Sequence, residues 1–206
     1  MKKFTALLAA MMALLMLFTA CAKTPADDSN EPVNTIEGAP LELLGGLVTD
    51  AEIPFMCENA ELSAENVEWL LGLTADDYTA NVANGAVSMA MMSAQAHMVA
   101  LLECKDFETA KTVKEKLHTQ FDIRRWVCVI PEMCYVIDSG KYVFFVASTV
   151  DFGEALLNGF TALAQDNVGE RLDVEGATGK VVEMNEDMGM DDVDPDMGVD
   201  DMGMAE

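Results

Sequence analysis

The sequence predicts an α+β domain with a four-stranded antiparallel sheet, in the order ββαββα, covered on one face by helices. Three observations favour this class. Residues 78–92 and 97–104 have the apolar composition and length of two strands. Residues 134–138 and 141–149 form a second such pair around a Ser-Gly turn. A helical pattern follows each pair, and this order is typical of a sheet with helices on one side.

Two short helical segments precede the first strand pair. Residues 39–48 form an apolar segment that two adjacent glycines weaken as a helix. Ser63 can cap a second segment, which Gly72 would end. Thr74 then begins a turn or another short helix. We expect these elements to lie at an edge of the sheet.

The first strand pair leads into the clearest helix of the chain. Residues 93–96 are the expected hairpin loop, and Gly85 marks a possible bulge in the first strand. Asp106 has the residue type and position of a helix N-cap. The following apolar residues recur at spacings of three and four, which predicts an amphipathic helix; they are Phe107, Ala110, Val113, Leu117 and Phe121.

The second strand pair is preceded by Pro131, which interrupts strand pairing. Gly140 supplies the positive φ that a tight hairpin turn needs. Residues 151–154 (DFGE) resemble a capping box with Asp in place of Ser or Thr. They predict the start of a closing helix that ends near Gln165.

The first twenty residues have the order of a secretory signal peptide. Lys2 and Lys3 are followed by an apolar run over residues 4–18 and by small residues. Leu-Phe-Thr-Ala-Cys at 17–21 resembles the lipobox cleaved by lipoprotein signal peptidase, although Leu is commoner than Phe at its second position. The resemblance implies cleavage before Cys21 and a diacylglycerol thioether on its sulfur. An ordinary signal with an incidental cysteine is the alternative.

These features divide the chain into four parts. Residues 1–20 are the signal peptide, and residues 21–38 are a lipid-anchored flexible tether. Residues 39–168 are the α+β domain. Residues 169–206 form an acidic tail rich in Met, Asp and Gly, which repeats Asp-Met-Gly and is expected to be disordered. Weak binding of divalent cations by its carboxylates, or of Cu(I) by its thioethers, is a possible role.

The charge and the cysteines restrict the partners. The formal net charge of −24 disfavours nucleic acid as a partner, because phosphate backbones repel such a chain. An even number of cysteines after Cys21 permits disulfides in an exported protein but does not require them. Cys128 and Cys134 could pair only if the chain reversed between them; the other two are Cys57 and Cys104.

Catalytic residues are not evident. The only histidines are His97 and His118, and a nucleophile needs a positioned base. A small envelope hydrolase or a thiol enzyme that pairs Cys128 or Cys134 with His97 is therefore an alternative without a motif. We expect no catalytic, cofactor-binding or metal-ligating set, because no spacing typical of one is present.

One cluster has the chemistry of a ligand site. Arg124, Arg125 and Trp126 form the only basic and aromatic cluster in this acidic chain. A guanidinium presents paired donors to a carboxylate or phosphate, so the cluster is a candidate anion-binding site. The alternative is a helix-end charge next to a packed tryptophan.

The chain also resembles a widespread, uncharacterised lipoprotein family of Gram-positive bacteria that carries a domain of unknown function. The resemblance covers about residues 40–165 and depends on the strand HMVALL at 97–102, the lysine-bearing helix after Asp106, the segment 121–131 and YVIDSGKYV at 135–143. In that family an acidic residue often precedes the first apolar strand, where this chain has a histidine. The resemblance implies export and a fold, and it implies no activity.

Together these features predict a membrane-anchored, non-enzymatic binding or protein-interaction module at the cell envelope. The expected location is the extracytoplasmic face of the cell membrane, to which the lipid on Cys21 attaches the chain. The expected partners are the membrane and an envelope protein or small ligand.

Overall fold

The computed structural model describes residues 34–126 and 128–176. The predicted signal peptide at 1–20, the predicted lipidation site Cys21, most of the predicted tether and residues 177–206 of the predicted tail lie outside the described residues. Within the described ranges, none of the helices has both the length and the apolar character that crossing a membrane requires.

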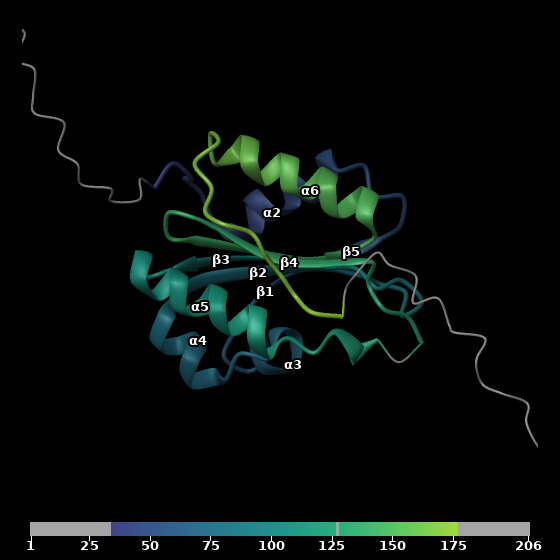
Figure 1. Cartoon of the computed structure of the whole chain (residues 1–206), viewed down its shortest axis with the longest axis horizontal. Coiled ribbons are helices and arrows are strands. Elements are labelled where there is room, and N and C mark those ends of the chain that lie inside the picture. Colours follow the sequence, from purple (N-terminus) through teal and green to yellow (C-terminus); the bar gives the residue numbers. More distant parts are fainter. Residues whose placement is uncertain (1–33, 127, 177–206) are drawn as a thin grey trace, which may run out of the picture. The chain divides into compact units, whose positions relative to one another are not determined.

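A six-stranded antiparallel sheet forms the centre of the fold, in the order β1-β2-β3-β5-β4-β6 (Figure 1). The α+β class, the antiparallel sheet and its two hairpins are confirmed, but the predicted number of four strands is wrong. The sequence missed the strand at each edge. The strands are β1 (Cys57–Glu61), β2 (Val82–Ala90), β3 (Met98–Cys104), β4 (Met133–Ser139), β5 (Tyr142–Ser148) and β6 (Leu172–Asp173).

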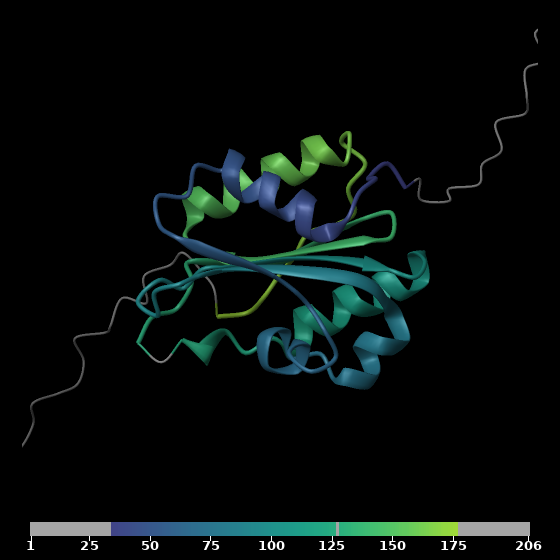
Figure 2. The same ribbon diagram turned by 180° about the vertical axis from the view of Figure 1, so that it is seen from behind.

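Helices cover both faces of the sheet, so the prediction of one covered face is wrong (Figures 1 and 2). The physical reason lies in the central strands, which are apolar along nearly their whole length and not alternating. Such strands must be shielded from water on two sides. One face packs against α2 (Pro40–Asp50) and α6 (Val150–Leu163), and the other against α3 (Val67–Leu71), α4 (Ala75–Asn81) and α5 (Phe107–Gln120).

Several predicted local signals are confirmed. Asp106 caps α5 by accepting from the backbone N–H of Thr109 at 2.8 Å, while the Thr109 hydroxyl accepts from the backbone N–H of Asp106 at 2.9 Å. Gly72 ends α3 at a φ of +76°, and Gly140 makes the β4–β5 turn at a φ of +57°. Thr74 caps α4, so of the two predicted alternatives at this point, a turn or a short helix, the short helix is formed.

Other local predictions need correction. The helix α6 begins at Val150, before the predicted capping box, and its N-cap residue makes no side-chain bond. The carboxylate of Glu132 accepts from the Val150 backbone N–H at 3.1 Å instead. The sheet irregularity falls between Val82 and Asn84 and not at Gly85.

Two further corrections concern the segment between β1 and β2. Residues 78–81 belong to α4 and not to the first strand, because the cap at Thr74 starts a helix that runs through them. The N-cap of α3 is Asn66 rather than Ser63. Ser63 instead opens the turn that leads into that helix, where its carbonyl accepts from the Asn66 and Val67 N–H groups.

The folded part extends beyond the predicted limits of 39 and 168. β6 pairs with β4, and the Val174 N–H donates to the Cys134 carbonyl at 2.9 Å. The segment around Glu170 is held by Lys114, whose ammonium donates to the Asp138 carboxylate at 2.7 Å and to the Glu170 carbonyl. Residues that were assigned to the tail by composition thus add a strand to the sheet.

The two ends of the described chain lie at opposite ends of the sheet. At the hairpin end, Gly140 packs directly against Asn34. We call the other end, where β1, β3 and β4 begin and β2 and β5 end, the His97 end. The chain leaves the fold at the His97 end, where Gly176 lies beside Ile123 of the 3-10 turn η1 (Ile123–Arg125). The site described next lies at this end.

Candidate functional site

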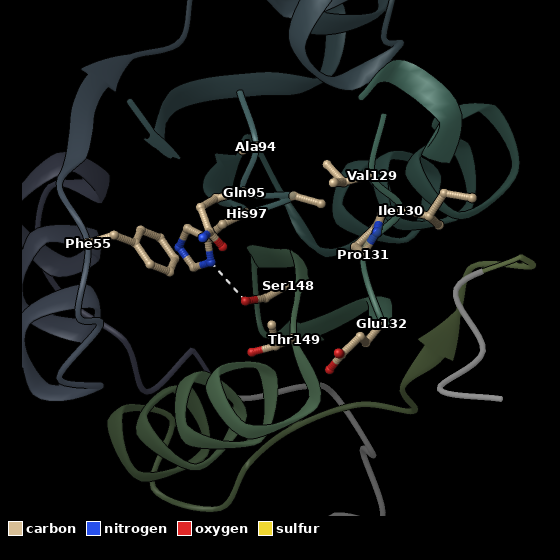
Figure 3. A pocket seen from close by; sticks show the side chains of 11 residues that line it. Phe55, Ala94, Gln95, His97, Val129, Ile130, Pro131, Glu132, Ser148 and Thr149 are labelled. Atoms are coloured by element: carbon tan, nitrogen blue, oxygen red, sulfur yellow. Dashed lines mark hydrogen bonds between the residues drawn. The ribbon is translucent and has the colours of Figure 1, made fainter. Parts of the chain in front are cut away.

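A pocket of about 200 Å³ opens at the His97 end of the sheet (Figure 3). The β2–β3 loop, the segment before β4 and the last residue of β5 meet there. Phe55, which precedes β1, closes one side. We call this cavity the His97 pocket; its lining includes residues 94–97 and 129–132 with Ser148 and Thr149.

A buried His-Ser pair forms the polar wall of the pocket. Because Met98 pairs with Ala147 in the sheet, the preceding His97 and the following Ser148 lie opposite each other. Their Nδ1 and Oγ atoms are 2.8 Å apart, and both side chains are almost fully buried. Figure 3 shows the imidazole between Phe55 and Ser148. The Phe55 ring meets it edge-on, with 5.2 Å between the ring centroids.

The environment keeps this imidazole neutral. Burial lowers the pKa of His97 to about 4. Its Nε2 atom is buried and has no hydrogen-bond partner among the described residues. A general base works best when its pKa is near the operating pH, so His97 accepts a proton poorly at neutral pH.

A catalytic relay is not assembled around His97. Such a relay needs a third group that orients the imidazole and stabilises its charge. Within the described ranges no carboxylate bonds to His97, and the nearest candidate in the pocket, Glu132, accepts from the backbone of α6 instead. Ser148 as a whole residue is only 1% exposed. The pair therefore has the character of an internal polar contact between two strands.

The cysteines do not join His97. Cys134 packs in the core on the face of the sheet that α5 covers. His97 lies against Phe55, and Phe55 packs on Phe152 of α6, which covers the opposite face. Burial raises the pKa of the Cys134 thiol far above its ordinary value, which opposes formation of a nucleophilic thiolate. Cys128 is exposed, and all four described cysteines are free thiols. The Cys134–His97 pairing of the thiol-enzyme alternative is thus not formed.

The predicted Arg-Trp cluster is assembled and gains a second tryptophan. The Arg125 guanidinium lies 4.8 Å from the ring centroid of Trp69 and 5.5 Å from that of Trp126, and it donates to the Leu70 carbonyl. Its burial lowers its pKa. Arg124 is exposed beside it. We call Trp69, Arg124, Arg125 and Trp126 the arginine patch.

Trp69 was missed at the sequence level, although a signal was present. Within the short helix α3 the buried residues are Val67, Leu70 and Leu71, whereas the side chain of Trp69 is 72% exposed. A tryptophan on the outer side of an amphipathic segment is a candidate contact residue. Its contact with Arg125 depends on tertiary packing and could not be read from spacing.

Neither arginine of the patch forms a direct ion pair with a described carboxylate, although the charge of Asp122 acts on Arg125 and favours its protonated form. Asp122 is close in sequence, but its Oδ1 accepts from the Arg124 backbone N–H at 2.9 Å. Five other basic side chains do form ion pairs with described carboxylates: Lys111, Lys114, Lys116, Lys141 and Arg171. The patch therefore offers two guanidinium groups that no described carboxylate contacts directly, with Asp122 as the nearby negative charge on Arg125.

Exposed apolar side chains surround the same end of the sheet. Met91 and Met92 lie in the β2–β3 loop, and the Met91 N–H donates to the carbonyl of Met56 at 3.0 Å. Ile130 borders the pocket, and Val150 begins α6. We call these five residues the apolar rim. With Trp69, they make up all the large exposed apolar side chains in the described ranges.

The comparisons with known proteins add no assignment: no protein-family model, curated protein or solved structure matches the chain. The resemblance to a Gram-positive lipoprotein family therefore stays a prediction. In residues 34–126 and 128–176, no group of three or more His, Cys, Asp or Glu side chains is placed to hold a metal ion.

Proposed function

We propose that the chain is a membrane-tethered, non-enzymatic binding module that contacts an envelope protein through the apolar rim. The observation that carries this proposal is the collection of exposed apolar side chains at one end of the sheet. Exposed apolar side chains gathered at one end of a fold are typical of interaction sites, since binding removes their surface from water. Met56, 75% exposed, and its neighbours Met91 and Met92 supply adaptable contacts.

The chemistry of the His97 pocket supports binding over catalysis. A hydrolase that used His97 would need an imidazole that takes up a proton near neutral pH and an accessible nucleophile. The lowered pKa of His97 and the enclosure of Ser148 disfavour both requirements. The pocket instead adds a concave surface beside the rim, into which a partner side chain can insert.

The proposed anchor fits the placement of the rim. Residues between Cys21 and Asn34 span at most about 45 Å when fully extended. Asn34 lies at the hairpin end of the sheet, and the apolar rim lies at the other end. The chain thus joins the described domain at the end of the sheet away from the rim, so the point of attachment does not itself cover the rim.

Anchoring is tested by growing producing cells with labelled palmitate. We expect the label on the mature protein and its loss in a Cys21→Ser variant, which should move to the soluble fraction. A native protein that retains residues 1–20, or that carries an unmodified Cys21, would contradict the anchor.

Binding is tested by retaining envelope proteins on the immobilised soluble chain, residues 22–206. The rim variant Met91→Ser/Met92→Ser should lose the retained partner, while the control variant Lys111→Ser, on exposed α5, should keep it. Equal retention by all three chains would reject the rim as the binding surface. Turnover of an ester, peptide or thioester substrate by the soluble chain would reject the non-enzymatic assignment.

A further inference from the structure

The chain leaves the fold beside the arginine patch. After β6, the Val174 N–H donates to the Cys134 carbonyl, and a Cβ on Gly176 would lie 3.5 Å from Ile123 Cγ2. Ile123 opens the turn that carries Arg124 and Arg125. The segment that follows Gly176 therefore starts next to the turn that carries the two arginines, neither of which forms a direct ion pair with a described carboxylate.

The patch has the chemistry to hold a carboxylate next to an apolar group. Arg125 is partly desolvated between two indole rings, which strengthens its attraction to an anion. Arg124 is exposed and free to turn toward the same ligand. The adjoining face of Trp69 is open to solvent and can accept an apolar side chain, including a thioether.

The end of the chain has the complementary composition. Residues 183–206 contain no basic residue, and they repeat Asp-Met-Gly at 187–189, 196–198 and 201–203. Each repeat places a carboxylate next to a methionine, and the glycine allows close approach of the backbone. The residues between Gly176 and Glu183 reach up to about 25 Å, which is ample because Arg124 follows Ile123 directly.

We propose that residues 183–206 dock on the arginine patch of their own chain, with carboxylates on Arg124 and Arg125 and a methionine on Trp69. The net charge of −24 repels a separate anionic ligand, whereas a tethered segment competes at an effective concentration in the millimolar range. The docked segment covers the exposed side chain of Trp69. This proposal does not depend on the anchor or on the partner.

The two tryptophans of the chain, Trp69 and Trp126, both belong to the patch, so intrinsic fluorescence reports on it directly. Acrylamide quenching is compared between the soluble chain 22–206, a chain that ends at Val182, and a full-length variant with Asp187, Asp196 and Asp201 changed to Asn. We expect weaker quenching in the first chain. The other two chains should be quenched more strongly. In 1 M NaCl, quenching of the first chain should increase to the level of the other two.

A second variant separates docking from a change in the fold. Arg124→Gln should remove the protection in the full chain and leave quenching of the shortened chain unchanged. Equal quenching of the full and shortened chains at low salt would overturn the proposal. Protection that disappears on dilution would also overturn it, since the segment would then dock on a second copy. Neither result bears on the apolar rim, whose test uses envelope proteins.

Discussion

Acidification should destabilise the fold through His97. The imidazole has a pKa of about 4 in the folded chain, against an ordinary value of about 6.5 when unfolded. Between these values the unfolded chain binds more protons than the folded chain. The free energy of unfolding therefore falls as the pH is lowered from 6.5 toward 4, and it is fully retained above 6.5. From these two pKa values, the loss between pH 7.5 and pH 5 is about 2 kcal/mol.

The assay is urea unfolding at pH 7.5 and pH 5, followed by circular dichroism, for the soluble chain and for His97→Gln. Glutamine retains a group that can bond to Ser148 but does not titrate. The variant can be less stable than the native chain at both pH values. Its free energy of unfolding should nevertheless fall by about 2 kcal/mol less between pH 7.5 and pH 5 than that of the native chain. Carboxylates titrate in both chains and cancel in this comparison.

His118→Gln is the matched control, because it removes the other histidine and retains His97. His118 lies on α5, where its Nε2 atom is 3.0 Å from the Asp173 carbonyl oxygen. We expect the free energy of unfolding of this variant to fall as much between pH 7.5 and pH 5 as that of the native chain. If His97→Gln also loses as much as the native chain, burial of a neutral imidazole does not contribute to the acid sensitivity, and the reasoning fails.

Three further measurements test other contacts. Gly72→Ala should lower the free energy of unfolding by about 2 kcal/mol, because φ is positive there and the added Cβ would lie 2.9 Å from the Gln120 carbonyl oxygen. Gly46→Ala, in the middle of α2, should raise the free energy of unfolding by about 0.5–1 kcal/mol, because an added Cβ there meets no atom within 4 Å. Lys114→Met should cost about 2 kcal/mol and increase hydrogen exchange near Glu170, because two acceptors lose a charged donor; unchanged exchange there would contradict this role. Titration of a 183–206 peptide with Ca²⁺ or Cu(I) should give no heat at millimolar metal, and a saturable signal would revive the metal-binding alternative.

Local chemistry made part of the fold predictable. Asp106 and Gly140 act within a few residues of their own position, so a single sequence suffices to place the helix and the hairpin. The edge strands could not be found in this way. β1 reads CENAE and β6 has two residues, and each exists because a neighbouring strand offers backbone hydrogen bonds. The second helical layer follows from strand burial, which becomes evident only once the strands are paired.

The site divides in the same way. Arg125 and Trp126 were candidates because their residue types are rare in this chain, whereas Trp69 joins them only through packing of α3 against the turn η1. His97 was expected at the start of a strand, and its partner Ser148 is set by pairing of strands far apart in sequence. Residue type thus identified groups with chemistry, and the topology decided which of them meet.

Site-specific photocrosslinking in producing cells tests the binding surface most directly. A photoreactive side chain replaces Met92 on the apolar rim or, as the control, Thr112 on exposed α5. The proposed function predicts one discrete adduct from position 92, lost in cells that lack the identified partner, and none from position 112. Adducts from position 112 alone, or in equal yield from both positions, would contradict binding at the His97 end of the sheet.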